Sequence, residues 1–291
     1  MRVLSLVVCA VARAHSDFLV LSSARSGSSF FVKTLNSHRE ICARGELLHP
    51  EWGRCSGNCA GAVGGAVEAL LAERLTAWAP PDGEPVLETW RQRVVGSYAK
   101  CGRKARGFKW FPASQGARRG DVANVAAWAT ASDVKFIDLR RRDVLAHVAS
   151  LQRKKIDGVA PKVYAAKEGG VAFGKSDAPS AAAAAALARV AVAAVNVTFA
   201  KKACASLKRS RETIDAILSD VPPSRVHRVY YEDLLDERAN GTWAAVLDYL
   251  GVQIAPLRTT LVRVRNASAP RFLDEDLAEA TLRDAGCASH L

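Results

Sequence analysis

The segment that most constrains the fold of this chain is FLVLSSARSGSSFFVKTLNSH, which runs from Phe18 to His38. Its first part, Phe18–Ser23, predicts a buried strand, because a run that is apolar on both faces fits a parallel sheet covered by helices. A loop of small polar residues follows, and Ser28–Ser37 has the periodicity of a helix. A helix that starts directly after such a loop attracts anions through its backbone N–H groups and its dipole. We therefore expect a phosphate-like group to bind here.

Strands and helices alternate along the rest of the chain. Further strands are predicted at Arg106–Phe111, Val134–Leu139 and Arg225–Tyr231. Helices are predicted at Gly61–Trp78, Val86–Lys100, Asp121–Thr130, Asp143–Lys155, Ala181–Ser219 (with a break near Asn196), Glu232–Leu250 and Arg271–Ala285. This alternation predicts an α/β fold with a mostly parallel sheet flanked by helices, and ligands at the carboxyl ends of the strands.

The remaining segments define the expected domain organisation. Arg39–Pro50 and Glu51–Ala60 are predicted to connect elements without forming a strand. Residues 15–291 are expected to make one domain. Within it, residues 158–180 contain several Gly and Pro and no strong period, which favours a mobile lid. Asp143 is placed to cap the start of the helix at Asp143–Lys155. Gly251 is placed to end the helix at Glu232–Leu250.

The loop between the first strand and its helix has residues suited to an anion. Ser26, Gly27, Ser28 and Ser29 are small enough for their N–H groups to approach one, and Arg25 can form a two-pronged contact with phosphate or sulfate oxygens. The ATP/GTP loop G-x-x-x-x-G-K-[ST] does not match, because its Lys would fall on a serine. Taken alone, the loop is also compatible with an ordinary strand-to-helix turn.

A second basic feature is FIDLRRRDVLAHVASLQ, Phe136–Gln152. A predicted strand ends there in three arginines, and a helix begins near Asp143. Ser150 lies about two helical turns further on, roughly 10 Å along the axis. Arg142 and Ser150 can hold one phosphate from two sides if the chain doubles back over the ligand. A solvated basic cluster next to a helix serine is the alternative interpretation.

The two features together resemble the two cofactor motifs of the PAPS-dependent sulfotransferases, in particular the luminal and bacterial branches. In that family a P-[KR]-S-G-[TS]-[TS] loop holds the 5′-phosphosulfate of 3′-phosphoadenosine 5′-phosphosulfate (PAPS). An Arg, with a Ser eight residues later, holds the 3′-phosphate. ARSGSS matches the first motif, with Ala24 where Pro is commoner, and Arg142 and Ser150 match the second. The resemblance implies a P-loop-like sulfotransferase fold, PAPS as donor and no metal.

Further residues match the same family in order. In ARGELLHP, Glu46 follows a Gly as the family's proposed catalytic base does, and in GFKWF, Lys109 matches a strand Lys that faces the sulfuryl group. The resemblance thus implies catalytic roles for Glu46, Arg25 and Lys109. It implies cofactor binding by Arg25, Ser26, Gly27, Ser28, Ser29, Arg142 and Ser150. A solvated loop carboxylate and a Lys at a sheet edge are the alternatives for Glu46 and Lys109.

Two details of these motifs concern structure. Strand alternation should turn Lys109 to the face opposite Phe108 and Trp110. The segment that begins with YYEDL resembles the YEDL…FLGV strand and helix of the family, and we expect structural roles for its Tyr231, Glu232 and Asp233.

The expected reaction is transfer of a sulfuryl group from PAPS to the hydroxyl of a carbohydrate or a protein tyrosine, which releases PAP. A P-loop kinase with Asp138 as metal ligand, and a secreted glycan-binding protein without catalysis, remain as alternatives. The net charge of +12 favours an anionic ligand, although a generally basic surface would also produce it. No nucleic-acid partner is expected, and the oligomeric state stays open.

The N-terminus and the cysteines predict a secretory location. Residues 1–14 have the layout of a signal peptide or of a truncated membrane anchor, since their apolar run is too short to span a bilayer. Three glycosylation sequons begin at Asn196, Asn240 and Asn266. Without the leader, six cysteines remain, an even number that favours disulfides: Cys42, Cys55, Cys59, Cys101, Cys204 and Cys287. We expect a glycoprotein of the Golgi lumen, or a secreted one, with possible membrane association through the N-terminus.

Overall fold

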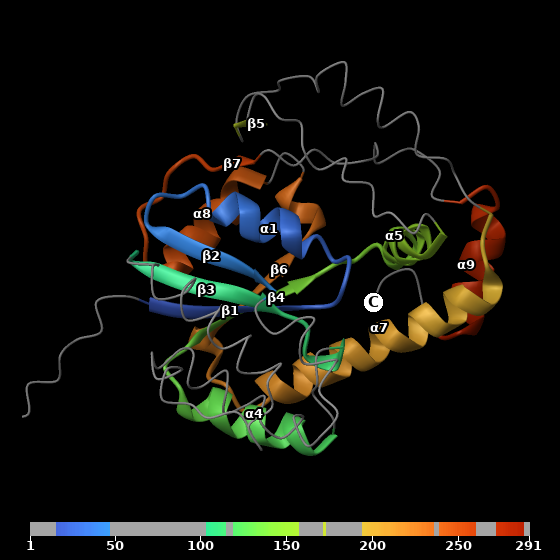
Figure 1. The fold of residues 1–291 in the computed structure, drawn as a ribbon, viewed down its shortest axis with the longest axis horizontal. Helices are drawn as coiled ribbons and strands as arrows, with labels where there is room; N and C mark the ends of the chain where they lie inside the picture. Colours follow the sequence, from blue (N-terminus) through green and yellow to red (C-terminus); the bar gives the residue numbers. More distant parts are fainter. Residues whose placement is uncertain are drawn as a thin grey trace, which may run out of the picture.

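A five-stranded parallel sheet forms the centre of the computed structural model (Figure 1). The structure describes residues 16–46, 103–114, 119–156, 171–172, 194–235, 239–259 and 272–287. The strands lie in the order β2 (Ile41–Glu46), β3 (Ala105–Trp110), β1 (Ser16–Ser22), β4 (Lys135–Arg140) and β6 (Val226–Tyr230). A separate antiparallel pair joins β5 (Val171–Ala172) to β7 (Arg258–Thr259).

Helices cover both faces of the sheet. Figure 1 shows α1 (Ser28–Leu35) and α8 (Ala239–Leu250) on one face, and α4 (Arg119–Ala131) and α7 (Val197–Leu218) on the other. The other helices of the described residues, α5 (Val144–Ile156) and α9 (Glu275–Asp284), pack against α7. Short 3₁₀ turns are η4 (Pro112–Ser114), η5 (Pro223–Arg225) and η6 (Glu232–Leu234). The predicted α/β fold with a mostly parallel, helix-flanked sheet is confirmed.

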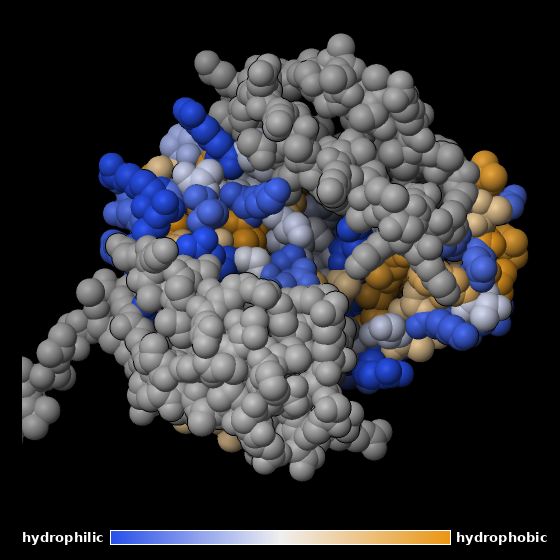
Figure 2. Space-filling model, in the orientation of Figure 1, coloured by the Kyte–Doolittle hydropathy of each residue, from blue (hydrophilic) through white to orange (hydrophobic). Residues whose placement is uncertain are grey.

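Two apolar clusters hold these layers together. One lies between the sheet and the α1/α8 layer, where Phe31 and Trp243 stack with their ring centroids 5.3 Å apart. The other joins α5, α7 and α9 around residues such as Val148 and Phe272. A disulfide between Cys204 and Cys287 fastens α7 to the residues after α9. Hydrophobic residues also reach the surface over α7 and α9, at the right of Figure 2.

Strand β1 lies at the point where the sheet order reverses. Its neighbours are β3 on one side and β4 on the other, so successive crossovers leave β1 in opposite directions. In open α/β sheets, the crevice at such a switch point, beyond the carboxyl ends of the strands, is where ligands bind. The loop after β1 and the β4–α5 junction, which contain the two predicted motifs, both lie at this edge.

Several details of the sequence prediction are confirmed. Asp143 caps α5, since its Oδ1 accepts a hydrogen bond of 2.8 Å from the N–H of Ala146. Asn196, which was predicted only as the place of a helix break, caps α7 in the same way through the N–H of Phe199, also at 2.8 Å. Gly251 follows α8 with a φ of 72°, the left-handed conformation that ends helices and that glycine adopts without strain.

Two predicted segments differ from the structure. Arg39–Pro50 was predicted to be a connection, but its residues 41–46 form β2, an edge strand in which Ile41 and Cys42 are buried. Its buried stretch is too short to show a period. The helix predicted at Glu232–Leu250 is instead a 3₁₀ turn, η6, followed by α8, because the side chain of Glu232 is engaged at the β4–α5 junction.

Several predictions lie outside the described residues. They concern the leader at 1–14, the connection at 51–60, the helices at 61–78 and 86–100, all of the 158–180 segment except β5, and the Ala-rich stretch up to residue 193. Among the helices of the described ranges, none is both long and apolar enough to cross a membrane.

Candidate active site

The loop after β1 is a tight turn with an unusual backbone. The N–H of Ser26 donates to the carbonyl of Ser23 at 3.3 Å, which closes a four-residue turn. Arg25 occupies its third position with a φ of 67°, and it is the only non-glycine residue of the described chain with a positive φ. A positive φ at that position alone defines a type II turn, in which glycine is the usual occupant. No local sequence pattern indicates that an arginine takes this conformation.

The left-handed conformation recurs two residues later, at Gly27, where φ is 87°. Backbone that alternates in this way turns successive N–H groups toward one concave side and forms an anion-binding nest. The start of α1 adds N–H groups that have no partner within the helix. In the same loop the hydroxyl of Ser26 is fully buried and has no hydrogen-bond partner among the described residues. These features fit an anion with several oxygens.

Glycine is also required at position 27 by its neighbour. A Cβ atom there would lie 2.0 Å from the ring of Tyr231. The Tyr231 ring makes an edge contact with Phe30. The guanidinium carbon of Arg141 lies over the same ring, 5.2 Å from the ring centroid. The ring of Tyr231 therefore packs against the loop at Gly27, which agrees with the structural role expected for Tyr231.

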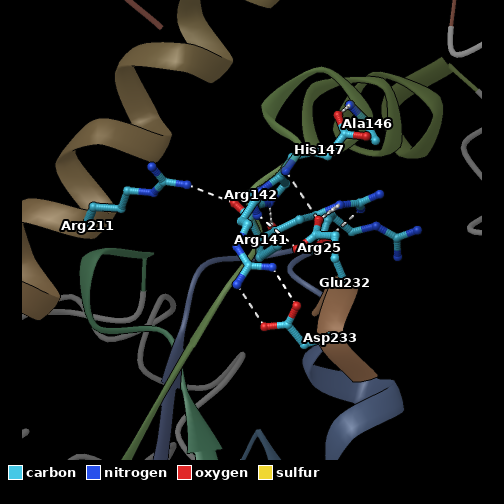
Figure 3. Close-up of polar contacts among 10 residues, drawn as sticks. Arg25, Arg141, Arg142, Ala146, His147, Arg211, Glu232 and Asp233 are labelled. Atoms are coloured by element: carbon cyan, nitrogen blue, oxygen red, sulfur yellow. Dashed lines mark hydrogen bonds and ion pairs between the residues drawn. The ribbon is translucent and has the colours of Figure 1, made fainter. Parts of the chain in front are cut away.

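Helix α5 contacts the loop from the other side (Figure 3). The Nε–H of Arg25 donates to the hydroxyl of Ser150 at 3.0 Å. Nε2 of His147 lies 2.6 Å from the carbonyl oxygen of Ala24, and Nη1 of Arg141 lies 3.4 Å from that of Arg25. The structure thus brings one predicted residue of each motif, Arg25 and Ser150, into direct contact.

Arg142 is held elsewhere. Its two terminal nitrogens donate to the carboxylate of Asp233 at 2.6 and 2.8 Å, and its guanidinium lies 3.9 Å from the ring centroid of Tyr230. The hydrogen bond to Asp233 raises the pKa of Arg142, which keeps it charged. Glu232 accepts from the backbone N–H groups of Arg142 and Asp143 at 3.0 and 3.2 Å. Both acidic residues therefore support the β4–α5 junction.

Lys109 joins the loop to the predicted base. Its ammonium donates to the hydroxyl of Ser29 at 2.9 Å and lies 2.8 Å from Oε1 of Glu46. Lys109 is paired in register with Val20, which belongs to the α1-facing cluster, so its side chain points toward α1. Strand alternation predicted that it would lie on the face opposite Phe108 and Trp110. The Lys109 side chain is 7% exposed and that of Glu46 is 27% exposed, so the pair lies at the boundary between the protein interior and the solvent.

A bulge in β2 makes this pairing possible. The register with β3 shifts between Arg44 and Glu46, so that Glu46, rather than Gly45, lies opposite Lys109. In a regular ladder Gly45 would lie opposite Lys109, and Glu46 would point to the other face of the sheet. Gly45 was the available sign, since a glycine inside a strand often marks a bulge.

Asp138, the metal ligand of the kinase alternative, points away from this site. Its Oδ2 accepts from Arg140 at 2.8 Å and from Arg228 at 2.9 Å, and its side chain is fully buried. Arg140 also pairs with Asp215 of α7. A carboxylate already neutralised by two arginines is a poor ligand for Mg²⁺. No cluster of metal-ligating side chains occurs in the described ranges.

Sequence reasoning missed His147, Arg141 and the contact of Tyr231 with Gly27. His147 could have been found, because it lies three positions before Ser150 and four after Asp143, on one face of a helix. The other two contacts join residues more than 100 positions apart, and no local pattern indicates them.

Comparisons with known proteins give structural similarity only. No protein-family model and no curated protein matches the chain. It is similar to the sulfotransferase domain from the curacin biosynthetic pathway (18% identity, TM-score 0.46, covering 90% of this chain and 81% of that one). It is also similar to the sulfotransferase domain from the Synechococcus PCC 7002 olefin synthase (17%, 0.46, 91% and 82%) and to a sulfotransferase from Alicyclobacillus acidocaldarius (13%, 0.45, 93% and 95%). These sequence identities and TM-scores are too low to carry an argument about function, so the function of this chain is inferred from its own residues.

Proposed function

We propose that this chain transfers a sulfuryl group from PAPS to an acceptor hydroxyl and releases PAP. The observation that supports this most is the position of Lys109, whose ammonium contacts both Ser29 of the anion loop and the carboxylate of Glu46. A cation between an anion site and a carboxylate base is the arrangement that transfer of a charged group to a hydroxyl requires.

The residues present fit PAPS. The nest around Ser26, with its buried hydroxyl, suits the 5′-phosphosulfate, and Arg25 can add a two-pronged contact. Ser150 accepts from Arg25, so its own hydroxyl proton is available to a phosphate oxygen. Arg142 uses two of the five N–H donors of a guanidinium on Asp233, so others can reach the 3′-phosphate.

The proposed chemistry assigns a role to each side chain. PAPS supplies a sulfuryl group whose bond to the 5′-phosphate oxygen breaks as the acceptor oxygen bonds to sulfur. Glu46 accepts the proton of the acceptor hydroxyl. Lys109 and Arg25 stabilise the charge that develops on the leaving and sulfuryl oxygens. As in phosphoryl transfer, positioning and charge stabilisation provide most of the catalysis, and here cationic side chains provide the charge that a metal supplies elsewhere.

Replacing the proposed base tests this assignment. We expect Glu46→Gln to keep PAP affinity and to lose turnover with radiolabelled PAPS by about 10²-fold or more, the range of general-base catalysis. Glu40→Gln is a matched control, since Glu40 is a carboxylate of the same region that contacts the N–H of Gln253 instead of the site. Absence of PAP binding by the wild-type protein would rule out the proposed function.

The acceptor and the cellular location extend the proposal. We propose a carbohydrate hydroxyl, with protein tyrosine as the second choice, and a secretory location with the N-terminus as leader or anchor. The Cys204–Cys287 disulfide and the exposed sequon at Asn196 support an oxidising lumen. An acceptor screen over glycans, tyrosine peptides and lipids, read by mass spectrometry, tests the first part.

Expression in secretory cells tests the location. We expect a glycosidase-sensitive mass that Thr198→Ala reduces. This substitution removes the sequon while leaving the Asn196 side chain in place as the cap of α7. Retention of the protein in the cytosol would contradict a secretory location.

A further inference from the structure

The turn that carries Arg25 is not favoured by its own sequence. Type II turns prefer proline at the second position and glycine at the third. Here those positions hold Ala24 and Arg25, and a left-handed arginine is disfavoured by contact of its Cβ with the backbone. The conformation must therefore be held by contacts from outside the turn.

His147 is placed to provide that contact. In a type II turn the central peptide, between the second and third residues, is flipped relative to its orientation in a type I turn, and the carbonyl of Ala24 belongs to this peptide. Nε2 of His147 lies 2.6 Å from this carbonyl oxygen. A carbonyl oxygen only accepts, so Nε2 carries the proton and donates it. Return of the peptide to the other orientation would remove the acceptor and leave the donor of His147 unpaired.

The surroundings keep His147 in the required state. The residue is 2% exposed, and Arg141, Arg211 and Arg25 contribute positive charge nearby. Burial and these cations lower its pKa to about 3, so the ring is neutral, with one N–H, at all physiological pH values. His147 is then a fixed donor.

We propose that His147 is a positioning residue: by donating to Ala24, it holds Arg25 in the left-handed conformation and so preforms the anion loop before any ligand binds. It acts through the loop, and it lies on the same helix as Ser150, so one element sets both the backbone and the Arg25 side chain. The effect of His147 on ligand binding rests on the proposed function. The hydrogen bond that holds the turn does not depend on that function.

Three variants separate positioning from general stability. His147→Leu removes the donor at similar bulk, whereas His147→Gln keeps an N–H that can reach the same carbonyl. Gln152→Leu is the matched control: Gln152 lies on the same helix, is also 2% exposed and has two hydrogen bonds, but it bonds to Ala194 and Asn196 instead of the loop.

The first measurement needs no ligand. Amide hydrogen exchange of Ser26, whose N–H closes the turn, is followed in the ligand-free protein. We expect exchange about tenfold faster in His147→Leu than in wild type, the scale of one lost buried hydrogen bond. His147→Gln should restore most of the protection, and Gln152→Leu should leave it unchanged.

The second measurement is PAP affinity by calorimetry. We expect His147→Leu to bind PAP about tenfold more weakly, with recovery in His147→Gln and a change of less than about twofold in Gln152→Leu. If His147→Leu does not fold, His147→Asn takes its place, because its amide is one methylene shorter and cannot reach Ala24 as Gln does.

The outcomes distinguish the two proposals. Equal exchange of Ser26 in wild type and His147→Leu would overturn the positioning role, as would failure of Gln to restore it. If wild type does not bind PAP, the proposed function fails, while the exchange data still decide whether His147 holds the turn.

Discussion

Single residues around the loop after β1 carry most of the unusual geometry of this protein. Arg25 is left-handed, Gly27 accommodates the ring of Tyr231, and His147 is buried within reach of three arginines. The left-handed Arg25 and the burial of His147 near cations each cost folding free energy, and strain that persists in a fold tends to occur where a site must be preformed. Their concentration at one loop is therefore an argument for function at that loop.

The charge state of His147 makes stability depend on pH. Its pKa is about 3 in the folded chain and near 6.5 when unfolded, so the unfolded state binds the proton first as the pH falls. Stability is unaffected above about pH 6.5 and decreases between pH 6.5 and 3. At pH 5 the expected loss is about 2 kcal/mol.

Urea unfolding at pH 7 and pH 5 measures this loss. His227, whose pKa burial also lowers, adds a loss of the same sign in every variant. His147→Gln should therefore be less acid-sensitive than wild type. Equal sensitivity of the two proteins would contradict the assignment of a neutral, buried His147.

Arg142 is the residue proposed to bind the 3′-phosphate. Because its guanidinium is shared with Asp233, a simple alanine variant would mix two effects. We expect Arg142→Gln to weaken binding of PAP about 10- to 100-fold, the scale of hydrogen bonds to charged groups, and to leave AMP, which lacks the 3′-phosphate, unaffected. Asp233→Asn is the control and should retain PAP affinity. Equal losses for PAP and AMP would instead give Arg142 a purely structural role.

At the scale of elements, the bulge in β2 decides where the carboxylate of Glu46 points. We expect exchange of the two residues, Gly45→Glu with Glu46→Gly, to move the carboxylate off the position opposite Lys109, with a loss of turnover of about 10²-fold or more. Gly45→Ala is the matched control, because its φ is not positive and a Cβ there meets no atom within 4 Å. Radiolabelled transfer measures both. Full activity of the exchanged variant would show that Glu46 is not the base.

Elements with strong local patterns could be predicted from the sequence, and those defined by distant partners could not. The β1–loop–α1 unit and the β4–α5 unit were found because long apolar runs and an Asp143 cap mark them. Strand β2 was missed since its short buried stretch shows no period. The bulge depends on the register with β3, which lies about 60 residues further along the chain.

The same division applies to the site. Arg25, Ser150, Glu46 and Lys109 were named from motifs, and the structure places them in two contacting pairs, although their roles stay predictions. The left-handed Arg25 and the carbonyl contact of His147 are consequences of tertiary packing of α5 on the loop. A backbone dihedral imposed by a distant side chain leaves no trace in local propensity.

At the scale of the whole molecule, the Cys204–Cys287 disulfide closes a separation of 83 residues between α7 and the residues after α9. We expect the double variant Cys204→Ser, Cys287→Ser to lose about 2–4 kcal/mol, since the cross-link restricts the unfolded chain. Denaturant unfolding measures the loss, and the single variants report any effect of an unpaired thiol. An unchanged midpoint would mean that the bond contributes nothing to stability.

The Cys204–Cys287 disulfide is also connected to the site through α7. Arg211 of this helix donates to the carbonyl of Arg141 at 2.9 Å. Arg141 in turn contacts Arg25. PAP affinity of the double variant, measured below its unfolding midpoint, therefore shows whether the distal end of the fold influences the loop.

The contact between Lys109 and Glu46 has a consequence for the order of events. While the ammonium holds the carboxylate, the base is neutralised. If the donor draws Lys109 toward its sulfuryl group, the carboxylate is released only after the donor has bound, and an acceptor that arrives first meets a masked base. We expect a compulsory sequence, donor before acceptor, with PAP competitive against PAPS and noncompetitive against the acceptor. Initial-rate product inhibition reveals the sequence, and patterns of random addition would contradict it.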